Sequence, residues 1–418
     1  MNTVEPGRLS RNRAYTTLWT GMLLSELASE SAFIAFPLLI IAHSGTAVQI
    51  GLVTSVLALA RMAVNLPAGA IADRWDRKRL MVLAQCVRAA AMASVVAALL
   101  LDAYSIRQLL VVAVVEGAFS AVFQPAEHAA LSQVVPAAQL SDALARNAAR
   151  PFAALLLGPA LAGFTFGLHE LLPFAVGAGM LTVSFAALTL LRLPRRLPPS
   201  APDEAGHQGL LDGFRWLFRQ PGIRATVVWM VFVNLAFHAL VIVILVVAGE
   251  SNVHPGEIGL MMACFGAGGV LGATVAGRLH AALPAPVILI GSSWIFAGSA
   301  AALAFASQGV PAGALLGVAA VLMPVANTTV MTYQLVLTPD EIRGRLSGVV
   351  GGCADLAAAA GPVLGGTILA VTGDAMTGIL VCAAVLALVA AGSQLSPTLR
   401  RLPLPGDRPR RTTASEIP

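Results

Sequence analysis

The sequence predicts an all-α membrane protein with twelve transmembrane helices in two six-helix halves. Of its 418 residues, 57% are apolar and 11% are charged, with a mean hydropathy of +0.81. Because a soluble domain carries about 25% charged residues, a water-soluble fold is excluded. The apolar residues form twelve segments near the roughly 20 residues that a membrane span needs. The expected spans are 15–42, 47–72, 79–101, 107–131, 148–168, 171–191, 224–248, 256–279, 286–306, 311–337, 346–371 and 376–395.

The positive charges alternate with the spans. Of 26 lysines and arginines, 23 fall in alternate gaps or at their edges, two lie deeper within spans, and only Arg107 lies at the edge of a gap of the opposite phase. Cytoplasmic loops carry the excess of basic residues, so we expect both termini and every basic gap in the cytoplasm of a bacterium. The opposite gaps hold His43, Asp102 and Glu170. This alternation supports the count of twelve and a multi-pass protein of the cytoplasmic (inner) membrane.

One long break divides the chain into two groups of six spans. It opens with the Pro-rich stretch LPRRLPPSAPDEAGHQ and continues with LLDGFRWLFRQPGIR, whose apolar spacing predicts an amphipathic helix on the membrane surface. The expected organisation is a cytoplasmic tail 1–14, a first half 15–192, a cytoplasmic linker 193–222, a second half 223–395 and a basic tail 396–418.

The two halves repeat one another. AGAIADR at 68–74 is similar to ATVAGR at 273–278, with Arg74 and Arg278 offset by 204 residues. Pro136 and Pro339 are offset by 203, and so are two Gly-Pro pairs, in LLGPALAG and AAGPVLGG. Duplicated halves commonly place a substrate cavity at the membrane midplane between them. The paired helix-packing residues are Gly158, Pro159, Gly361 and Pro362.

Several motifs resemble the major facilitator superfamily over essentially the whole chain. GAIADRWDRKRL at 69–80 resembles the signature between spans two and three, although Asp76 replaces its usual glycine. That departure is common in a branch of macrolide, multidrug and siderophore exporters. FQPAEHAAL, LDGFRWLFRQP and TPDEIRGRLSG are similar to further landmarks of that branch. The resemblance implies a cytoplasmic-side gate formed by Gly69, Asp73, Arg74 and Arg77; the alternative for these charges is ordinary positive-inside topology.

The Gly-Pro pairs resemble the span-five signature that accompanies antiport in the superfamily. Small residues let helices approach closely, and proline reshapes a span. The span-four pattern departs from the family, because Ala113 and Glu116 stand where its arginine and glutamine are usual. The family's standard coupling arginine is therefore missing at that position.

Ionisable residues inside spans are the candidates for proton coupling. Such groups are costly in a membrane and usually face a cavity or a partner. A carboxylate in a partly dry cavity can exchange protons near neutral pH. The alternative is a static ion pair, formed by Arg61 with a span-one glutamate or by Arg88 with Glu116. The carboxylate candidates are Glu26, Glu30, Glu116 and Asp355, with Glu30 first.

Uncharged polar residues are expected to contact the cargo. Their alternative role is hydrogen bonding between helices, and a lone histidine among apolar neighbours is more often a packed residue. Glu127 and its neighbour His128 lie near the inner end of span four, where an interfacial position is the simpler interpretation. The substrate-cavity candidates are Asn234, His238, Asn327 and Gln334, with Tyr333 as a further polar contact.

These patterns predict a secondary transporter that exports an amphipathic small molecule, such as a drug, antibiotic or siderophore-like compound, by proton antiport with alternating access. The alternatives are an importer or facilitator of a metabolite or lipid, and a non-transporting membrane sensor. No catalytic, nucleotide or metal constellation stands out, so we expect no enzyme activity, cofactor or metal. The expected partners are the cargo, protons and membrane lipid, with no nucleic acid, and the expected state is a monomer.

Overall fold

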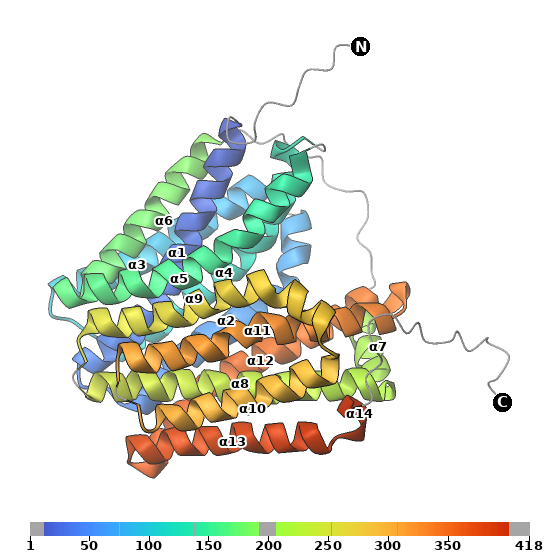
Figure 1. Ribbon diagram of the computed structural model, residues 1–418. Helices are drawn as coiled ribbons and strands as arrows, with labels where there is room; N and C mark the ends of the chain where they lie inside the picture. Colours follow the sequence, from blue (N-terminus) through green and yellow to red (C-terminus); the bar gives the residue numbers. More distant parts are fainter. Residues whose placement is uncertain are drawn as a thin grey trace, which may run out of the picture.

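The computed structural model describes residues 12–74, 76–136, 139–191, 206–251, 253–306 and 308–400. Within these residues the chain is helical throughout and contains no strand (Figure 1). The helices are α1 Arg13–Ala42, α2 Ala47–Arg74, α3 Arg77–Leu100, α4 Ile106–Val134, α5 Leu140–Leu168, α6 Leu172–Leu190, α7 Gly206–Arg219, α8 Pro221–Glu250, α9 Pro255–Ala282, α10 Ala285–Leu303, α11 Val310–Leu337, α12 Asp340–Thr372, α13 Ala375–Leu395 and α14 Pro397–Arg400.

Twelve of the described helices are long and apolar enough to cross a membrane, which confirms the predicted fold. Each predicted span overlies one of them. The largest differences are at the starts of α5 and α12, which begin at Leu140 and Asp340, before the apolar segments expected from 148 and 346. Their first turns contain polar residues, so hydropathy does not reveal that the helix has already begun. The tails 1–11 and 401–418 and linker residues 192–205 lie outside the described residues.

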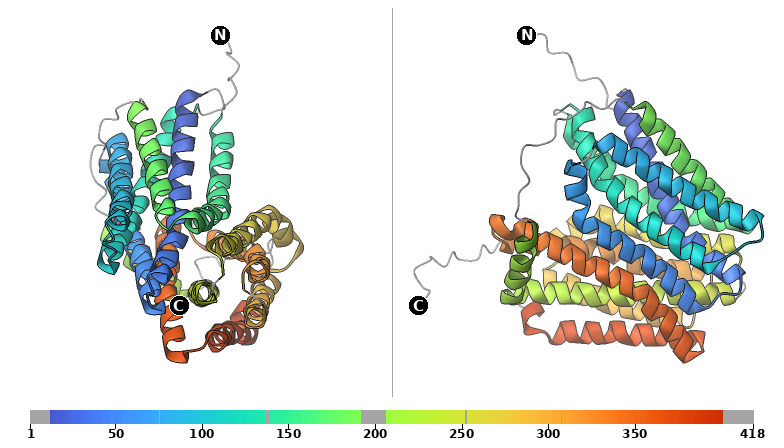
Figure 2. Two further views of the ribbon diagram at one scale, coloured as in Figure 1. Left: turned by 90° about the vertical axis from the view of Figure 1, so that its left-hand side faces the viewer. Right: turned by 180° about the vertical axis from the view of Figure 1, so that it is seen from behind.

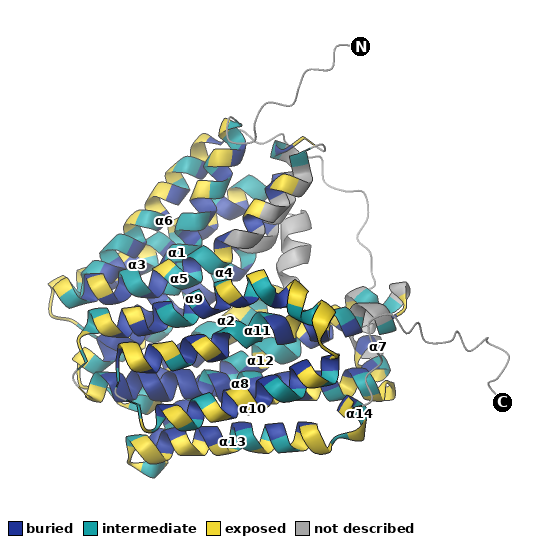
Figure 3. Cartoon of the chain, in the orientation of Figure 1, coloured by how far each residue is buried: buried dark blue, intermediate teal, exposed yellow. Residues whose placement is uncertain are grey.

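The bundle has two distinguishable ends. The basic end is where α1 begins at Arg13, α3 begins at Arg77, and α7 lies against α12. The opposite end carries the turn after His43 and the turn that holds Glu170. Figure 1 and Figure 2 show α1–α6 and α8–α13 as two groups, which touch at the opposite end and diverge toward the basic end. Figure 3 shows the yellow, exposed residues of α10 and α13 facing outward, as lipid-facing helices require.

Glycines bring the halves into backbone contact at the opposite end. A Cβ added to Gly51 of α2 would lie 2.5 Å from the carbonyl oxygen of Pro362 in α12. On the other side of the bundle, a Cβ on Gly259 of α9 would lie 2.7 Å from the carbonyl oxygen of Pro159 in α5. A real side chain at either glycine would force these helices apart. Ser55 Oγ also accepts a hydrogen bond from the Val363 N–H across the halves, at 3.1 Å.

The two backbone contacts reveal the register of the internal repeat. Helix α2 runs from 47 to 74 and helix α9 from 255 to 282, so both ends of α9 lie 208 residues after those of α2. Helix α8 likewise follows α1 by 208 residues. Gly51 and Gly259 share this offset, and each packs on the proline of the other half's Gly-Pro pair. The offset of 204 inferred from Arg74 and Arg278 is therefore wrong for these helices, because Arg278 lies one turn before the end of α9. The offset of 203 holds for the Gly-Pro pairs.

We predict that Gly51→Val opens the opposite end. The valine side chain cannot fit against the Pro362 carbonyl, so the closed contact between α2 and α12 is destabilised. In a variant free of native cysteines, Ala58→Cys reports on the space between the halves, which Ala58 lines. Adding Gly51→Val should raise its labelling rate by a membrane-impermeant maleimide on intact cells several-fold.

The matched control is Gly291→Val in α10, because a Cβ there has no neighbour within 4 Å. It should leave the labelling rate of Ala58→Cys unchanged. Equal rates in the two glycine variants would show that the α2–α12 contact does not hold the opposite end closed.

Candidate functional site

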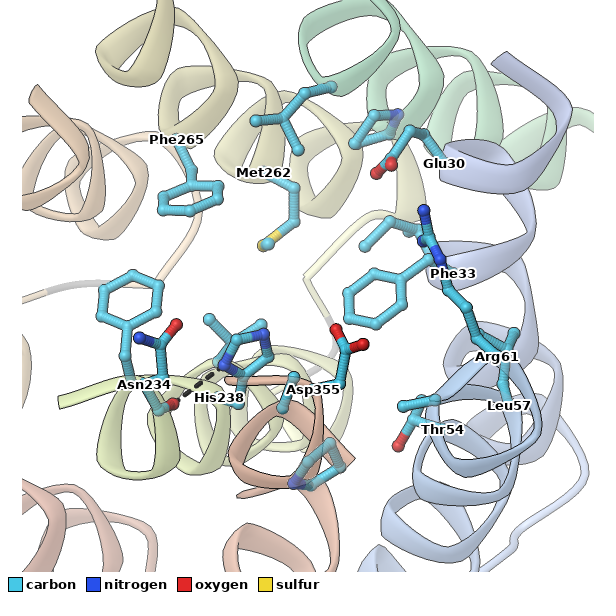
Figure 4. A pocket seen from close by; sticks show the side chains of 18 of the residues that line it. Glu30, Phe33, Thr54, Leu57, Arg61, Asn234, His238, Met262, Phe265 and Asp355 are labelled. Atoms are coloured by element: carbon cyan, nitrogen blue, oxygen red, sulfur yellow. Dashed lines mark hydrogen bonds between the residues drawn. The ribbon is translucent and has the colours of Figure 1, made fainter. Parts of the chain in front are cut away.

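A cavity of about 520 Å³ lies between the two halves. Helices of both halves line it, so both contribute to whatever it binds (Figure 4). Its wall mixes aromatic and methionine side chains with a few polar and charged ones. The lining residues are Glu30, Phe33, Ile34, Thr54, Leu57, Ala58, Arg61, Asn65, Leu155, Pro159, Asn234, Phe237, His238, Val241, Met262, Phe265, Met323, Asp355, Ala358 and Pro362.

Two oppositely charged side chains of the first half face each other at the cavity wall. Figure 4 shows the Arg61 guanidinium of α2 directed toward the Glu30 carboxylate of α1. The guanidinium attracts the carboxylate electrostatically. Among the described residues, neither Glu30 nor Arg61 has a side-chain hydrogen bond or an ion pair within 4.0 Å. Glu30 is thus a carboxylate that faces a cavity, with a positive charge nearby but not bound to it.

A second cavity carboxylate links the two halves. Asp355 of α12 accepts a hydrogen bond from Asn65 Nδ2 of α2, at 3.3 Å. Figure 4 shows its carboxylate directed into the cavity, on the side of α12. If both acids are ionised, the two carboxylates outnumber the one guanidinium of the lining. The cavity then favours neutral or positively charged molecules over anions.

The second half contributes a fixed histidine. His238 Nδ1 lies 2.8 Å from the carbonyl oxygen of Asn234, one turn earlier in α8. The amide of Asn234 is itself directed to the Met230 carbonyl oxygen, at 2.8 Å. Asn234 and His238 therefore line the cavity as expected. Asn327 and Gln334 do not, because they lie beyond Met323 along α11, toward the basic end.

The Gly-Pro pairs position the polar groups of the cavity. A Cβ on Gly158 of α5 would lie 2.5 Å from the Cβ of Glu30, so α1 and α5 are in close contact there. A Cβ on Gly361 of α12 would lie 2.6 Å from the Cβ of His238. The proline that follows each glycine lines the cavity itself. The pairs thus lie at the site as well as at the contact between halves.

Glu116 is enclosed in a hydrogen-bonded ion pair away from the cavity. Arg88 Nε donates to Glu116 Oε2 at 3.0 Å, and a second contact joins Arg88 Nη2 to Glu116 Oε1. Arg88 also donates to Ser25 Oγ and Ser29 Oγ of α1, at 2.6 Å each. The two charged side chains are 1% and 2% exposed. The structure therefore favours the static-pair interpretation for Glu116 over a role in proton coupling.

Glu26 also pairs with an arginine. Arg150 Nε donates to Glu26 Oε2 at 3.0 Å, and Arg150 Nη1 lies 3.4 Å from Glu127 Oε1. Glu127, expected near the interface, is instead buried and also accepts from Asn147 Nδ2, at 3.2 Å. The alternation of charges counts Arg150 with the basic gap before the fifth span, which is expected to begin at 148. Since α5 begins at Leu140, Arg150 lies well inside a helix, where an arginine needs a partner.

The expected gate is only partly described. The backbones of Gly69, Asp73 and Arg74 belong to α2, but the side chains of Asp73 and Arg74, like that of His128, lie outside the described residues. Arg77 begins α3 at the basic end. The unusual Asp76 is the N-cap of α3, and its carboxylate accepts from the Arg79 N–H at 2.9 Å. A carboxylate at this position stabilises a helix start, which glycine cannot do by a side-chain bond.

Twelve spanning helices in two repeated halves, with a mixed polar and apolar cavity between them, define a membrane transporter. The chain belongs to the major facilitator superfamily, since residues 8–402 match its family described as transmembrane secretion effector. Transporters of this kind are not enzymes.

Curated relatives and a solved structure agree with this assignment. The multidrug efflux pump Tap of Mycolicibacterium fortuitum is 27% identical over 355 residues, which cover 81% of this chain and 83% of that protein. The enterobactin exporter EntS of Shigella flexneri is 24% identical over 347 residues, covering 82% and 81%. A bacterial homologue of the human lysosomal transporter Spinster, solved in an inward-facing, unoccupied conformation, shares the fold with a TM-score of 0.72 at 16% identity, covering 93% of this chain and 97% of that one.

We predict that the Arg88–Glu116 pair stabilises the fold. Arg88→Met leaves the Glu116 carboxylate buried without its cation, which should lower the unfolding free energy by about 3–5 kcal/mol. The double variant Arg88→Met with Glu116→Leu removes both charges and should recover most of the loss. Thermal unfolding of the purified protein in detergent measures both effects.

Transport by the double variant separates structure from coupling. If Glu116 only holds Arg88, the folded double variant keeps proton-coupled flux. A stable double variant without flux would return Glu116 to the coupling candidates.

Proposed function

We propose that this protein exports an amphipathic small molecule by proton antiport with alternating access. The observation that carries the proposal is the cavity between the halves, where Glu30 and Arg61 face each other without being hydrogen-bonded. The protein would act in a bacterial cytoplasmic membrane with both termini in the cytoplasm. The basic end then faces the cytoplasm, and the cavity between the diverging halves takes cargo from that side.

The structure supports Glu30 as the first coupling candidate. Glu26 and Glu116 are engaged by arginines, whereas Glu30 and Asp355 line the cavity. Antiport requires that the binding of proton and cargo oppose one another, and a group that both bind achieves this directly. Ionised Glu30 attracts a cationic cargo, and proton binding removes that attraction. A proton arriving from outside would therefore favour cargo release, and proton loss to the cytoplasm would restore the binding state.

The lining supports an amphipathic cargo. Phe33, Phe237 and Phe265, together with two methionines, supply apolar contact, and a few polar groups can fix orientation. The similarity to a multidrug efflux pump and to an enterobactin exporter supports outward transport of organic molecules. The other proposed partners are protons and membrane lipid, and the proposed working unit is a monomer that does not bind nucleic acid.

We predict that Glu30→Gln abolishes proton coupling. Glutamine keeps the size of the side chain but cannot bind or release a proton at this position. Inside-out vesicles, acidified internally, are challenged with amphipathic cations such as ethidium and quinine. The wild type should release protons from the vesicles on cargo addition, and Glu30→Gln should release none above background.

Glu30→Asp is the matched control, because it keeps a carboxylate in the cavity and should retain part of the proton flux. Asp355→Asn, run in the same assay, tests the other cavity acid. Unchanged proton release in Glu30→Gln would remove Glu30 from the coupling step. Cargo movement in the inward direction without proton dependence would favour the importer.

A further inference from the structure

The internal repeat places His238 at the position equivalent to Glu30. Helices α1 and α8 each contain 30 residues and are offset by 208, which relates 30 to 238 and also 26 to 234. Packing gives the same answer independently. Gly158 lies against the Cβ of Glu30, and its counterpart Gly361 lies against the Cβ of His238. The two halves thus present one polar side chain each from matched positions on opposite walls of the cavity.

The hydrogen bond of His238 fixes what its ring offers to the cavity. A backbone carbonyl only accepts, so Nδ1 must donate its hydrogen to Asn234 O. In the neutral ring the remaining nitrogen, Nε2, then carries a lone pair and is an acceptor. Among the described residues no side chain or backbone group donates to Nε2, and Figure 4 shows the ring at the cavity. The matched positions therefore differ in chemistry, with an ionisable carboxylate on one wall and a neutral acceptor on the other.

We propose that Glu30 and His238 form a two-point recognition site for an amphipathic amine that carries a hydroxyl or amide N–H away from its amine. The Glu30 carboxylate binds the ammonium group, and His238 Nε2 accepts a hydrogen bond from the second donor. The apolar body of the cargo lies between them against Phe237 and Phe265. This assignment rests on the proposed function only in treating the cavity as the cargo site, and it makes His238 a specificity determinant rather than a coupling group.

The test is equilibrium binding to the purified full chain in detergent, with no proton gradient. The probes are 4-hydroxytamoxifen, an amphipathic tertiary amine whose phenolic hydroxyl lies at the far end of the molecule from its amine, and tamoxifen, which lacks that hydroxyl. A hydrogen bond to a buried acceptor contributes about tenfold in affinity. The wild type should bind 4-hydroxytamoxifen about tenfold more tightly than tamoxifen.

Two substitutions separate the cavity acceptor from the local structure. Asparagine can replace the Nδ1 donor to Asn234 but has no group at the position of Nε2, so His238→Asn should bind the two probes equally. Glutamine places an amide near the Nε2 position, so His238→Gln should keep most of the preference. Both variants should unfold at temperatures close to that of the wild type, which separates a loss of recognition from a loss of the fold.

Several outcomes would overturn the inference. These are equal binding of the two probes by the wild type, no binding of 4-hydroxytamoxifen, or an equal loss for both probes in His238→Asn. The wild-type comparison decides even if a variant fails to fold. A failure of export or proton coupling in vesicles, with the binding preference intact, would instead reject the proposed function and leave the recognition site standing.

Discussion

The organisation of this protein depends on close backbone contact between glycines and the carbonyl oxygens of two prolines. Gly51 against Pro362 and Gly259 against Pro159 join the halves at one end and leave the other end free to diverge. The same Gly-Pro pairs pack on α1 and α8 at the level of the cavity. The absence of side-chain volume at a few helical positions therefore determines three features together. These are the closed contact between the halves, the shape of the cavity, and the placement of Glu30 and His238.

The fold could be predicted from the sequence because two independent patterns agreed. Apolar segments set the number of spans, and the alternation of arginines tested that number. The register of the repeat was less accessible. Arg74 and Arg278 gave an offset of 204, while packing requires 208, because two arginines near helix ends need not occupy the same turn. Residue identity marks an end of a helix only to within a turn.

The candidate site could be predicted as a set of residue types but not as a geometry. Glu26, Glu30 and Glu116 look alike in sequence, each being an acid within a span. Their partners come from helices far apart in the chain, as with Arg150, which the charge pattern assigned to the edge of a basic gap. Only the fold shows that two of the acids are bound by arginines while Glu30 faces the cavity. Asn327 and Gln334 illustrate the converse, since a polar residue on a cavity helix can lie too far along its axis.

The backbone nature of the closure has a consequence for how such a protein diversifies. The contacts that hold the halves together involve main-chain oxygens and glycines, so few cavity side chains take part in them. Substitutions at positions such as Phe33, Met262 or Phe265 can change what the cavity accepts while the contact between halves stays the same. Selectivity and conformational switching are then nearly separate traits, and one scaffold can acquire new cargo by single substitutions.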